Sequence, residues 1–547
     1  MVKKDSLIKG TIILAAAALV ARFLGIFQRV PLEHMLSKDS GDYFVVANNV
    51  YMMLLIIATG GIPSAISKMI SERYALGRPF EAQRIYRAAL WFGAVTGVII
   101  ALLMYGLAPV YATKITEHPG ADASVRAIAP ALLLFPVIAM MRGYFQGRQM
   151  MVAGGLSQII EQVMRVLTSV GLALLVISWG WGDRWIAAAA TFGSVFGSIG
   201  AFAVMLYYAR KLKKQDTLDA AASSQAASSG VRKLSYSSIY KEMFNMSVPI
   251  VVAAMTVQFM YTFDSSLFNK LTGAYYDHET AKQVLNWLGM KAQAIAGIPP
   301  ILAIALSTSI IPVLSSAYSV CNMNEVQRQT SLVMRIVVFT GVPAALILTV
   351  AAVSVTGALF SDSGGSGMVA ALTAGTIFQI TMMTSNSILF GLGKARIPMR
   401  HTIIGLLVKV VASLVLAPLI GVYGLILSST LCFTVIASLN LRVIRSEVNL
   451  SVLGTRWYGY MATIAVSAAA GWITDMACRG LLKGLPHKLM YFISASATGI
   501  VSLGLYIVLL VLLRVVTADD ARQLPGPLRK VLTPLIRVTA RVKADSR

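Results

Sequence analysis

Charged side chains within long apolar segments are the residues of this sequence best placed to do chemistry. Five are cationic, namely Arg22, Arg29, Arg165, Lys291 and Lys409. A charge inside a membrane-spanning helix costs several kcal/mol unless it faces water, a partner or a substrate, so each is a functional candidate. Arg22 and Arg29 are seven residues apart and therefore share one helix face. Because arginine binds phosphate oxygens through two parallel hydrogen bonds, the set predicts an anionic cargo such as a diphosphate.

Three acidic residues accompany these cations, namely Asp42, Glu161 and Asp264. Glu161 precedes Arg165 by four residues, so the two either form an ion pair within one helix or face the cargo together. Asp264 has no partner nearby in the sequence, and it either pairs with an arginine of the first helix or binds a coupling cation. Arg29 lies near a helix end, where snorkelling to the membrane surface is the alternative to a role in binding.

We therefore predict one set of substrate-binding residues and one residue for ion coupling or gating. The substrate-binding set is Arg22, Arg29, Lys291, Arg165, Lys409, Asp42 and Glu161. Asp264 is the predicted coupling or gating residue, and the candidate driving forces are Na+, H+ and the membrane potential.

The composition indicates which elements must position these residues. Of 547 residues, 57% are hydrophobic and 13% are charged, and the mean hydropathy is +0.72, which excludes a soluble globular enzyme. Apolar stretches of about 20 residues recur along the chain, each long enough to cross a bilayer. We predict an all-α polytopic membrane protein with about fourteen transmembrane helices. These helices are expected at residues 7–30, 43–70, 86–111, 127–147, 155–178, 185–209, 242–270, 284–318, 330–357, 367–392, 399–420, 422–441, 457–477 and 487–515.

A polar stretch divides the chain. Residues 211–240 include the run AAASSQAASSG and lack an apolar period, which is typical of a flexible linker. We predict an N-terminal six-helix lobe (1–210), a cytoplasmic linker (211–240) and a C-terminal six-helix lobe (241–445). Two extra transmembrane helices (446–516) and a basic cytoplasmic tail (517–547) follow.

The basic residues are distributed as membrane topology requires. The chain has 47 Lys and Arg against 23 Asp and Glu, and most of the cations fall in alternate connecting segments. By the positive-inside rule, both termini are predicted to be cytoplasmic. We expect no nucleic-acid partner, because the sequence holds no soluble basic domain.

The segment 525–547 is predicted to be a basic interfacial helix on anionic membrane lipids, with a disordered tail as the alternative.

The two halves of the sequence repeat at an offset of 244 residues. RVLTSVGLALL aligns with KVVASLVLAPL, which places Arg165 on Lys409. Gly147 falls on Gly391 in the same alignment, and SAISKMISERY aligns with TSIIPVLSSAY. A repeat of six helices predicts two lobes related by a pseudo-two-fold axis along the membrane normal. Two such lobes, rocking around one midplane cavity, are typical of a secondary transporter.

Signals for enzymes and metal sites are lacking in the sequence. GLGK at 391–394 does not have the glycine spacing or the following Ser or Thr of a phosphate-binding loop. The five histidines and three cysteines are scattered without metal-ligand or disulfide spacing. We therefore expect neither an enzyme nor a bound metal or organic cofactor.

Four stretches carry a resemblance to a known group of membrane proteins. They are GGIPSAISKMISERYALGR from Gly60, RGYFQGRQMMVAGGLSQIIEQVMRV from Arg142, AGIPPILAIALSTSIIPVLS from Ala296 and FGLGKARIP from Phe390. Through them the chain resembles the polysaccharide-biosynthesis and stage V sporulation protein B group of the multidrug/oligosaccharidyl-lipid/polysaccharide exporter superfamily. Within that superfamily it looks close to the peptidoglycan lipid II flippases.

The resemblance implies a V-shaped pair of six-helix lobes, with two further helices that form a groove for a lipid tail. It also implies a cargo of undecaprenyl-diphosphate-linked saccharide, held through its diphosphate by the cavity cations. Arg22 and the Asp42 of DYFVVA match motifs of the family, and Lys291 stands where an arginine is usual. Gln28 and Leu55 stand where better-known flippases have arginine.

The resemblance and the cations together favour a flippase that moves a lipid-linked oligosaccharide, foremost lipid II, to the outer leaflet by alternating access. The alternatives are an exporter of a capsule, spore-cortex or other polysaccharide precursor, a drug/cation antiporter on the same scaffold, and a membrane-embedded glycosyltransferase. An antiporter of cationic drugs would be expected to present acidic residues to its cargo. We expect the protein to act as a monomer in the bacterial plasma membrane.

Overall fold

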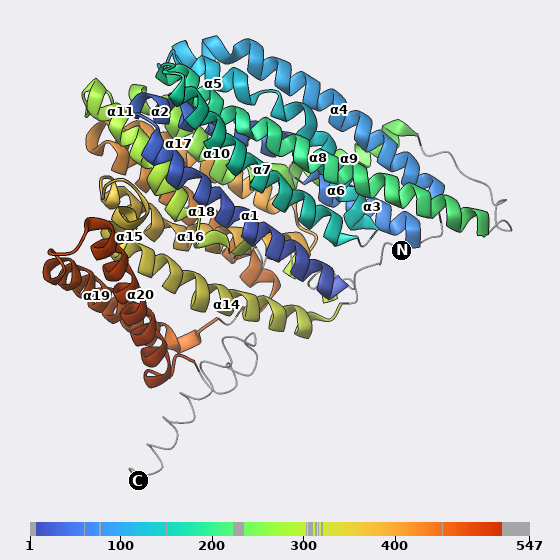
Figure 1. The fold of residues 1–547 in the computed structure, drawn as a ribbon. Helices are drawn as coiled ribbons and strands as arrows, with labels where there is room; N and C mark the ends of the chain where they lie inside the picture. Colours follow the sequence, from blue (N-terminus) through green and yellow to red (C-terminus); the bar gives the residue numbers. More distant parts are fainter. Residues whose placement is uncertain are drawn as a thin grey trace, which may run out of the picture. The chain divides into compact units, whose positions relative to one another are not determined.

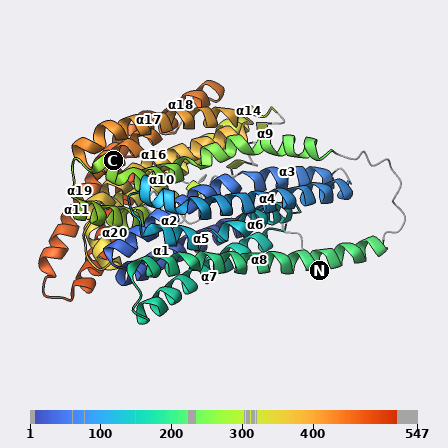
Figure 2. The same ribbon diagram turned by 90° about the horizontal axis from the view of Figure 1, so that it is seen from above.

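The computed structural model describes residues 7–222 and 235–516, with gaps at 60, 76–77, 149, 302, 305–309, 312–313, 315–316, 319–320 and 451. The side chain of Arg22, the middle of the predicted linker and the predicted basic tail lie outside the described residues. The described residues form helices and the turns between them, without a strand (Figure 1 and Figure 2). The chain divides into two compact units, unit 1 (Met1–Asn286) and unit 2 (Trp287–Arg547).

Unit 1 consists of long helices and one short π-helical segment, η1. Its elements are α1 (Leu7–Met35), α2 (Lys38–Thr59), α3 (Ile62–Ala75), α4 (Pro79–Val110), η1 (Tyr111–Ile115), α5 (Ala121–Ile128), α6 (Ala131–Gly147), α7 (Met151–Ser178), α8 (Asp183–Ala222), α9 (Tyr236–Ala254), α10 (Thr256–Thr272) and α11 (His278–Asn286). In this unit α7 packs along both α1 and α8, so these three helices are neighbours.

Unit 2 begins with a second π-helical segment, η2, and ends with a helical hairpin, α19 and α20. Its elements are η2 (Trp287–Ala292), α12 (Gln293–Ala296), α14 (Met323–Val350), α15 (Ala352–Leu359), α16 (Ser366–Gly391), α17 (Arg396–Ile420), α18 (Val422–Glu447), the 3₁₀ turn η3 (Gly454–Arg456), α19 (Trp457–Leu481) and α20 (His487–Leu512). Each of the fourteen segments expected from the sequence overlaps a described helix in one of the two units.

Several expected helices are broken where the backbone chemistry demands it. The segment expected at 43–70 divides into α2 and α3 at Gly61, whose φ of 73° lies in the left-handed region that favours glycine. The segment expected at 127–147 divides into α5 and α6 at Pro130, which lacks the N–H that a continuous helix needs. The helices α9 and α10 form one bent pair, with an angle of 52° between them.

The helices of both units are long and apolar enough to cross a membrane. The described residues contain 11 such helices, or up to 12 when the bent pair α9 and α10 is taken as one span. The architecture is therefore that of an all-helical polytopic membrane protein, as predicted. The count of fourteen spans is consistent with these helices and stays a prediction.

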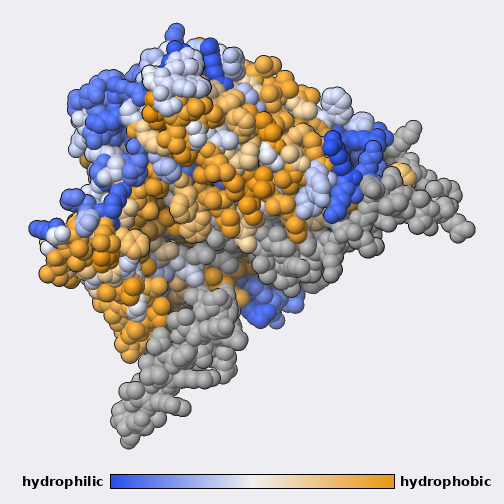
Figure 3. All heavy atoms as spheres, in the orientation of Figure 1, coloured by the Kyte–Doolittle hydropathy of each residue, from blue (hydrophilic) through white to orange (hydrophobic). Residues whose placement is uncertain are grey.

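Large hydrophobic side chains on the outside of the helices support this architecture. On α4 and α17, exposed leucine, isoleucine and valine residues recur at helical spacing, among them Val98, Leu102, Leu407, Val411 and Leu414. On the face drawn in Figure 3, hydrophobic side chains cover the middle of the unit 1 helices, and hydrophilic ones gather at helix ends. Soluble monomers rarely expose apolar patches of this extent, so these faces are suited to lipid.

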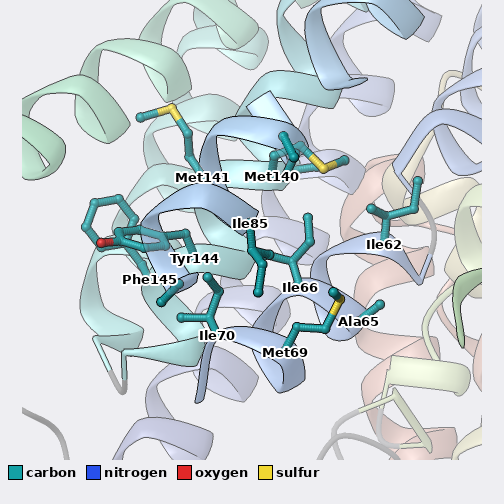
Figure 4. Close-up of a cluster of buried hydrophobic side chains, with 14 of the residues drawn as sticks. Ile62, Ala65, Ile66, Met69, Ile70, Ile85, Met140, Met141, Tyr144 and Phe145 are labelled. Carbon is teal, nitrogen blue, oxygen red and sulfur yellow. The ribbon is translucent and has the colours of Figure 1, made fainter. Parts of the chain in front are cut away.

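The core of unit 1 includes a cluster where α3, α4 and α6 meet. Ile66, Met69 and Ile70 of α3 pack against Ile85 of α4 and Phe145 of α6, and all five are almost fully buried (Figure 4). Unbranched and β-branched side chains interdigitate here, so the helices approach closely.

One close helix approach in this cluster is repeated in the other unit. A Cβ added to Gly147, the last residue of α6, would lie 2.8 Å from the Cβ of Ile70. A Cβ added to Gly391, the last residue of α16, would lie 2.8 Å from the Cβ of Leu314. Gly147 and Gly391 are 244 residues apart, and so are Ile70 and Leu314. The repeat found in the sequence therefore recurs as a matching contact inside each unit.

Replacement of either glycine by leucine should destabilise the protein. Gly147→Leu and Gly391→Leu would each force a helix away from its neighbour, at an expected loss of about 3 kcal/mol in the free energy of unfolding. The matched controls are Gly171→Leu on α7 and Gly504→Leu on α20, where an added Cβ meets nothing within 4 Å. Denaturant-induced unfolding in mixed micelles measures all four variants. Equal stability of the Gly147 and Gly171 variants would show that the close contact is not formed.

Candidate functional site

A carboxylate on α7 is held between two arginines inside unit 1. The Arg165 guanidinium donates to Oε1 of Glu161 at 2.8 Å, and the Arg142 guanidinium donates to Oε2 at 2.8 Å. Arg142 also donates to the Ser157 hydroxyl at 2.8 Å. The ion pair within one helix, expected from the four-residue spacing of Glu161 and Arg165, is therefore formed. Arg142, on α6, joins this network as a further member that the sequence did not single out.

The sequence of α7 and α8 explains why this network is buried. Ser157, Glu161, Arg165 and Ser169 follow one another every four residues, so they line one face of α7. Gly197 of α8 faces that stripe, and a Cβ there would lie 2.8 Å from the Glu161 carbonyl oxygen. The absence of a side chain at this position lets α8 cover the polar stripe. Among the described residues, Nε of Arg165 has no hydrogen-bond partner, so one buried donor is left for an anion.

The first helix approaches the same stripe. The Gln28 side chain of α1 donates to the Ser169 hydroxyl at 2.9 Å. A Cβ on Gly25 would lie 3.3 Å from Nε2 of the Gln162 side chain, so α1 and α7 are in close contact there. Arg29 is half-buried on α1. The backbone of Arg22 lies on the same helix, seven residues earlier.

Asp42 lies on α2 and is fully buried. Neither of its carboxylate oxygens has a hydrogen-bond partner among the described residues. One turn earlier, Asp39 forms an ion pair with Lys282 of α11, with Oδ1 and Nζ at 3.2 Å. Because a buried carboxyl group without a partner costs free energy, Asp42 is a strong candidate for a functional rather than a stabilising role.

Replacement of this carboxyl group by an amide should stabilise the fold. Asp42→Asn removes a buried ionisable group and keeps its shape, so we expect a gain of about 1–2 kcal/mol in the free energy of unfolding. The control is Asp39→Asn, which breaks a partly exposed ion pair and should change stability by about 1 kcal/mol or less. Thermal unfolding in micelles compares the two variants with the parent. A clear loss of stability in Asp42→Asn would mean that the carboxylate has a stabilising partner.

Asp264 is buried on α10. Two residues further along the same helix, the Ser266 hydroxyl is 2.6 Å from the Tyr111 hydroxyl. The helix that carries it is fixed against α2, because the Asn49 carbonyl oxygen accepts hydrogen bonds from Gln258 at 3.1 Å and from Thr262 at 2.9 Å. Asp264 is thus positioned by two polar contacts between α10 and α2.

In unit 2, Lys291 lies within the π-helical segment η2 and is only 1% exposed. Its ammonium donates to Oδ1 of Asp362 at 3.0 Å and to the Asp362 carbonyl oxygen at 3.3 Å. The rings of Trp287 and Phe360 lie about 6 Å from the same ammonium, where they favour a cation. Asp362, in the loop after α15, is a second residue that the sequence did not single out.

Asp362 is ionised at neutral pH for identifiable reasons. Partial burial raises the pKa of Asp362, but the hydrogen bonds from Lys291 and from the Gly364 N–H outweigh burial. The pKa of the carboxyl group therefore lies below its ordinary value. The loop thus carries a permanent negative charge against the buried ammonium.

Lys409 is fully buried in α17. Its ammonium donates to the Leu425 carbonyl oxygen at 2.9 Å and to the Ser428 hydroxyl at 3.0 Å, both on α18. The Ser413 hydroxyl is 2.8 Å from that of Ser428, which extends the network along α17. Arg165 and Lys409, aligned in the repeat, therefore each lie against the next helix of their own unit.

The structure thus brings some of the predicted residues together and separates others. Glu161 and Arg165 meet in one network, while Asp42 lies beside a separate pair, that of Asp39 and Lys282. Lys291 and Lys409 have different partners within unit 2. A cavity shared by the two units stays a prediction. Among the described residues, no group of three or more His, Cys, Asp or Glu residues is arranged to hold a metal ion.

Comparison with known sequences identifies relatives. The model of a family described as "Polysaccharide biosynthesis protein" matches residues 7–318. Lipid II flippase MurJ of Bacillus subtilis (strain 168) is 25% identical over 452 residues, which cover 80% of this chain and 81% of the relative. Stage V sporulation protein B of the same organism is 24% identical over 533 residues, which cover 95% of this chain and 98% of the relative.

Comparison with solved structures identifies the fold. A structure of lipid II flippase MurJ in an inward closed conformation matches with a TM-score of 0.63 at 14% identity, covering 90% of this chain and 98% of that chain. An inward-facing multidrug resistance MATE family transporter of the MOP superfamily matches with a TM-score of 0.60 at 14% identity, covering 80% of this chain and 98% of that chain. The helices of this protein therefore follow the fold shared by these membrane transporters.

Proposed function

Because the chain belongs to the polysaccharide biosynthesis protein family, we propose that it is a flippase for an undecaprenyl-diphosphate-linked saccharide. The cargo we assign is the peptidoglycan precursor lipid II, moved from the inner to the outer leaflet of the bacterial plasma membrane. The observation that carries the proposal is the similarity to a lipid II flippase over most of both chains. The likeness in fold to membrane transporters supports transport, as opposed to synthesis, as the activity.

The chemistry of the buried cations supports a diphosphate headgroup as the recognised group. Arg165 keeps a donor without an acceptor among the described residues, and the ammonium groups of Lys291 and Lys409 are buried. A charge-assisted hydrogen bond to phosphate is about twice as strong as a neutral one. We assign Arg22 and Arg29 to the same role, because their seven-residue spacing places them on one face of α1. Glu161 orients Arg165, and the carboxyl group of Asp42, which has no hydrogen-bond partner among the described residues, completes the proposed set.

Alternating access would carry the headgroup across the bilayer. An empty cationic site has a lower free energy when it faces the negative, inner side of the membrane. The membrane potential can therefore return the empty protein to its inward-facing state. We assign ion coupling or gating to Asp264, with Na+ or H+ as the coupling ion. In this proposal the protein works as a monomer with both termini cytoplasmic, and its tail binds anionic membrane lipids.

Rescue of a bacterium depleted of its own lipid II flippase tests the proposal directly. Expression of this chain should restore growth, and the purified chain in proteoliposomes should move fluorescent lipid II to the outer leaflet. The matched cargo control is the same lipid with a neutral headgroup, which should not move. Absence of both rescue and transport, with the protein shown to be in the membrane, would refute lipid II as the cargo.

A spore-cortex precursor is a second candidate cargo. The observation that favours it is the similarity to stage V sporulation protein B over nearly the full length of both chains. Restoration of spore cortex in a strain that lacks that protein, without rescue of the strain depleted of lipid II flippase, would decide for this alternative. Resistance to cationic dyes without any effect on the cell wall would instead favour a drug/cation antiporter.

A further inference from the structure

The buried cation Lys291 forms an ion pair with a largely exposed carboxylate. The lysine side chain is 1% exposed, while the side chain of Asp362 is 57% exposed. Lys291 is thus fixed inside unit 2, and Asp362 approaches it from a loop. Such a pair keeps the ammonium neutralised in the absence of any ligand, which avoids the penalty of an unpaired buried charge.

The loop at 360–365 is shaped to present that carboxylate. The Gly364 N–H donates to Oδ1 of Asp362, the same oxygen that accepts from Lys291. Gly365 has a φ of 79°, which turns the chain sharply into α16. A carboxylate held by an ammonium and a backbone N–H occupies the kind of position that a phosphate oxygen prefers.

The same loop is attached to the last helix of unit 2. The Lys488 ammonium of α20 donates to the Phe360 carbonyl oxygen, and the Tyr491 hydroxyl donates to the Ser363 hydroxyl at 3.5 Å. The Tyr491 ring also packs onto Gly357 of α15. Movement of Asp362 away from Lys291 would therefore change contacts at the beginning of α20.

We infer that Asp362 is an internal counter-ion that holds Lys291 in the empty protein and is displaced by the diphosphate of the cargo. This inference rests on the proposed function and adds a residue that determines specificity. A singly charged headgroup gains little by replacing a carboxylate that is already bound. A diphosphate brings more charge and more acceptor oxygens, so it competes successfully. Asp362 thereby raises the charge that a lipid headgroup needs in order to bind.

The first experiment measures binding of fluorescent lipid II and of its monophosphate analogue to the purified full-length chain. Asp362→Asn should tighten lipid II binding by about tenfold and should tighten monophosphate binding at least as much, since the competing anion is gone. Lys291→Met should weaken lipid II binding by about tenfold, and adding Asp362→Asn to it should change nothing further. Glu325→Gln, which breaks the exposed pair with Arg328, is the matched control and should leave both affinities unchanged.

The expected results differ if the pair of Lys291 and Asp362 only stabilises the fold. In that case Asp362→Asn leaves the affinities for lipid II and for its monophosphate analogue unchanged or weakens them. The double variant Lys291→Met/Asp362→Asn then binds lipid II like the parent. Either outcome would overturn the inference. Failure of the parent protein to bind or move lipid II would instead count against the proposed function, so the two failures are distinguishable.

A second measurement needs no variant. Hydrogen exchange of the parent protein should become faster in the peptide that contains 360–365 when lipid II binds, because displacement of Asp362 detaches this loop from Lys291. Peptides of α17, where Lys409 lies, serve as the internal reference and should not become faster. Lipid II binding with unchanged or slower exchange in the loop would contradict displacement of Asp362.

Discussion

Glu161→Gln should lower the free energy of unfolding by about 3 to 5 kcal/mol, because it leaves two guanidinium groups without their shared counter-ion. The side chains of Arg142 and Arg165 are 21% and 7% exposed, so water replaces little of the lost interaction. The three residues tie α6 to α7, and loss of the carboxylate would weaken that tie. Thermal and denaturant-induced unfolding in micelles measure the effect.

Two further variants show where the effect of Glu161→Gln comes from. Glu325→Gln breaks an exposed ion pair on α14 and should change stability much less than Glu161→Gln does. Adding Arg142→Met and Arg165→Met to Glu161→Gln removes the stranded charges and should recover much of the lost stability. Similar small losses in Glu161→Gln and Glu325→Gln would show that the buried network contributes little.

Arg22→Ala combined with Lys291→Ala should reduce lipid II transport in proteoliposomes by about 100-fold or more. Each lost charge-assisted hydrogen bond to the diphosphate is worth about 1.5–3 kcal/mol, so two together exceed the 2.7 kcal/mol or so that corresponds to a factor of 100. Each single variant should retain an intermediate rate. Arg328→Ala, which removes an exposed cation from α14, is the matched control and should transport like the parent. Unchanged transport in the double variant would mean that these cations do not bind the cargo.

The positions of the helices follow from the sequence, whereas their breaks follow only in part. Apolar length marked each segment because a bilayer imposes it. The break at Gly61 and the bend at Met255 depend on local backbone angles, which apolar length does not encode. The π-helical turn around Lys291 was likewise not expected, since one inserted residue leaves the hydrophobic pattern almost unchanged.

The candidate site divides in the same way into local and long-range features. The pair of Glu161 and Arg165 could be predicted because its partners are four residues apart on one helix. Arg142 is 19 residues from Glu161, and Asp362 is 71 residues from Lys291, so only tertiary structure joins them. An aspartate in a short polar loop has the sequence signature of a solvated residue, and nothing near Asp362 in the chain indicates a buried ammonium.

The contacts at Gly147 and Gly391 bear on how one polypeptide evolved to contain two similar bundles. If the two bundles arose by fusion of two copies, the crossing of these helices was kept, while the aligned position on the next helix became Arg165 in one copy and Lys409 in the other. An assembly of two identical subunits must carry every substitution twice. A fused duplicate can change one copy alone, and so can adapt to a molecule whose two ends differ.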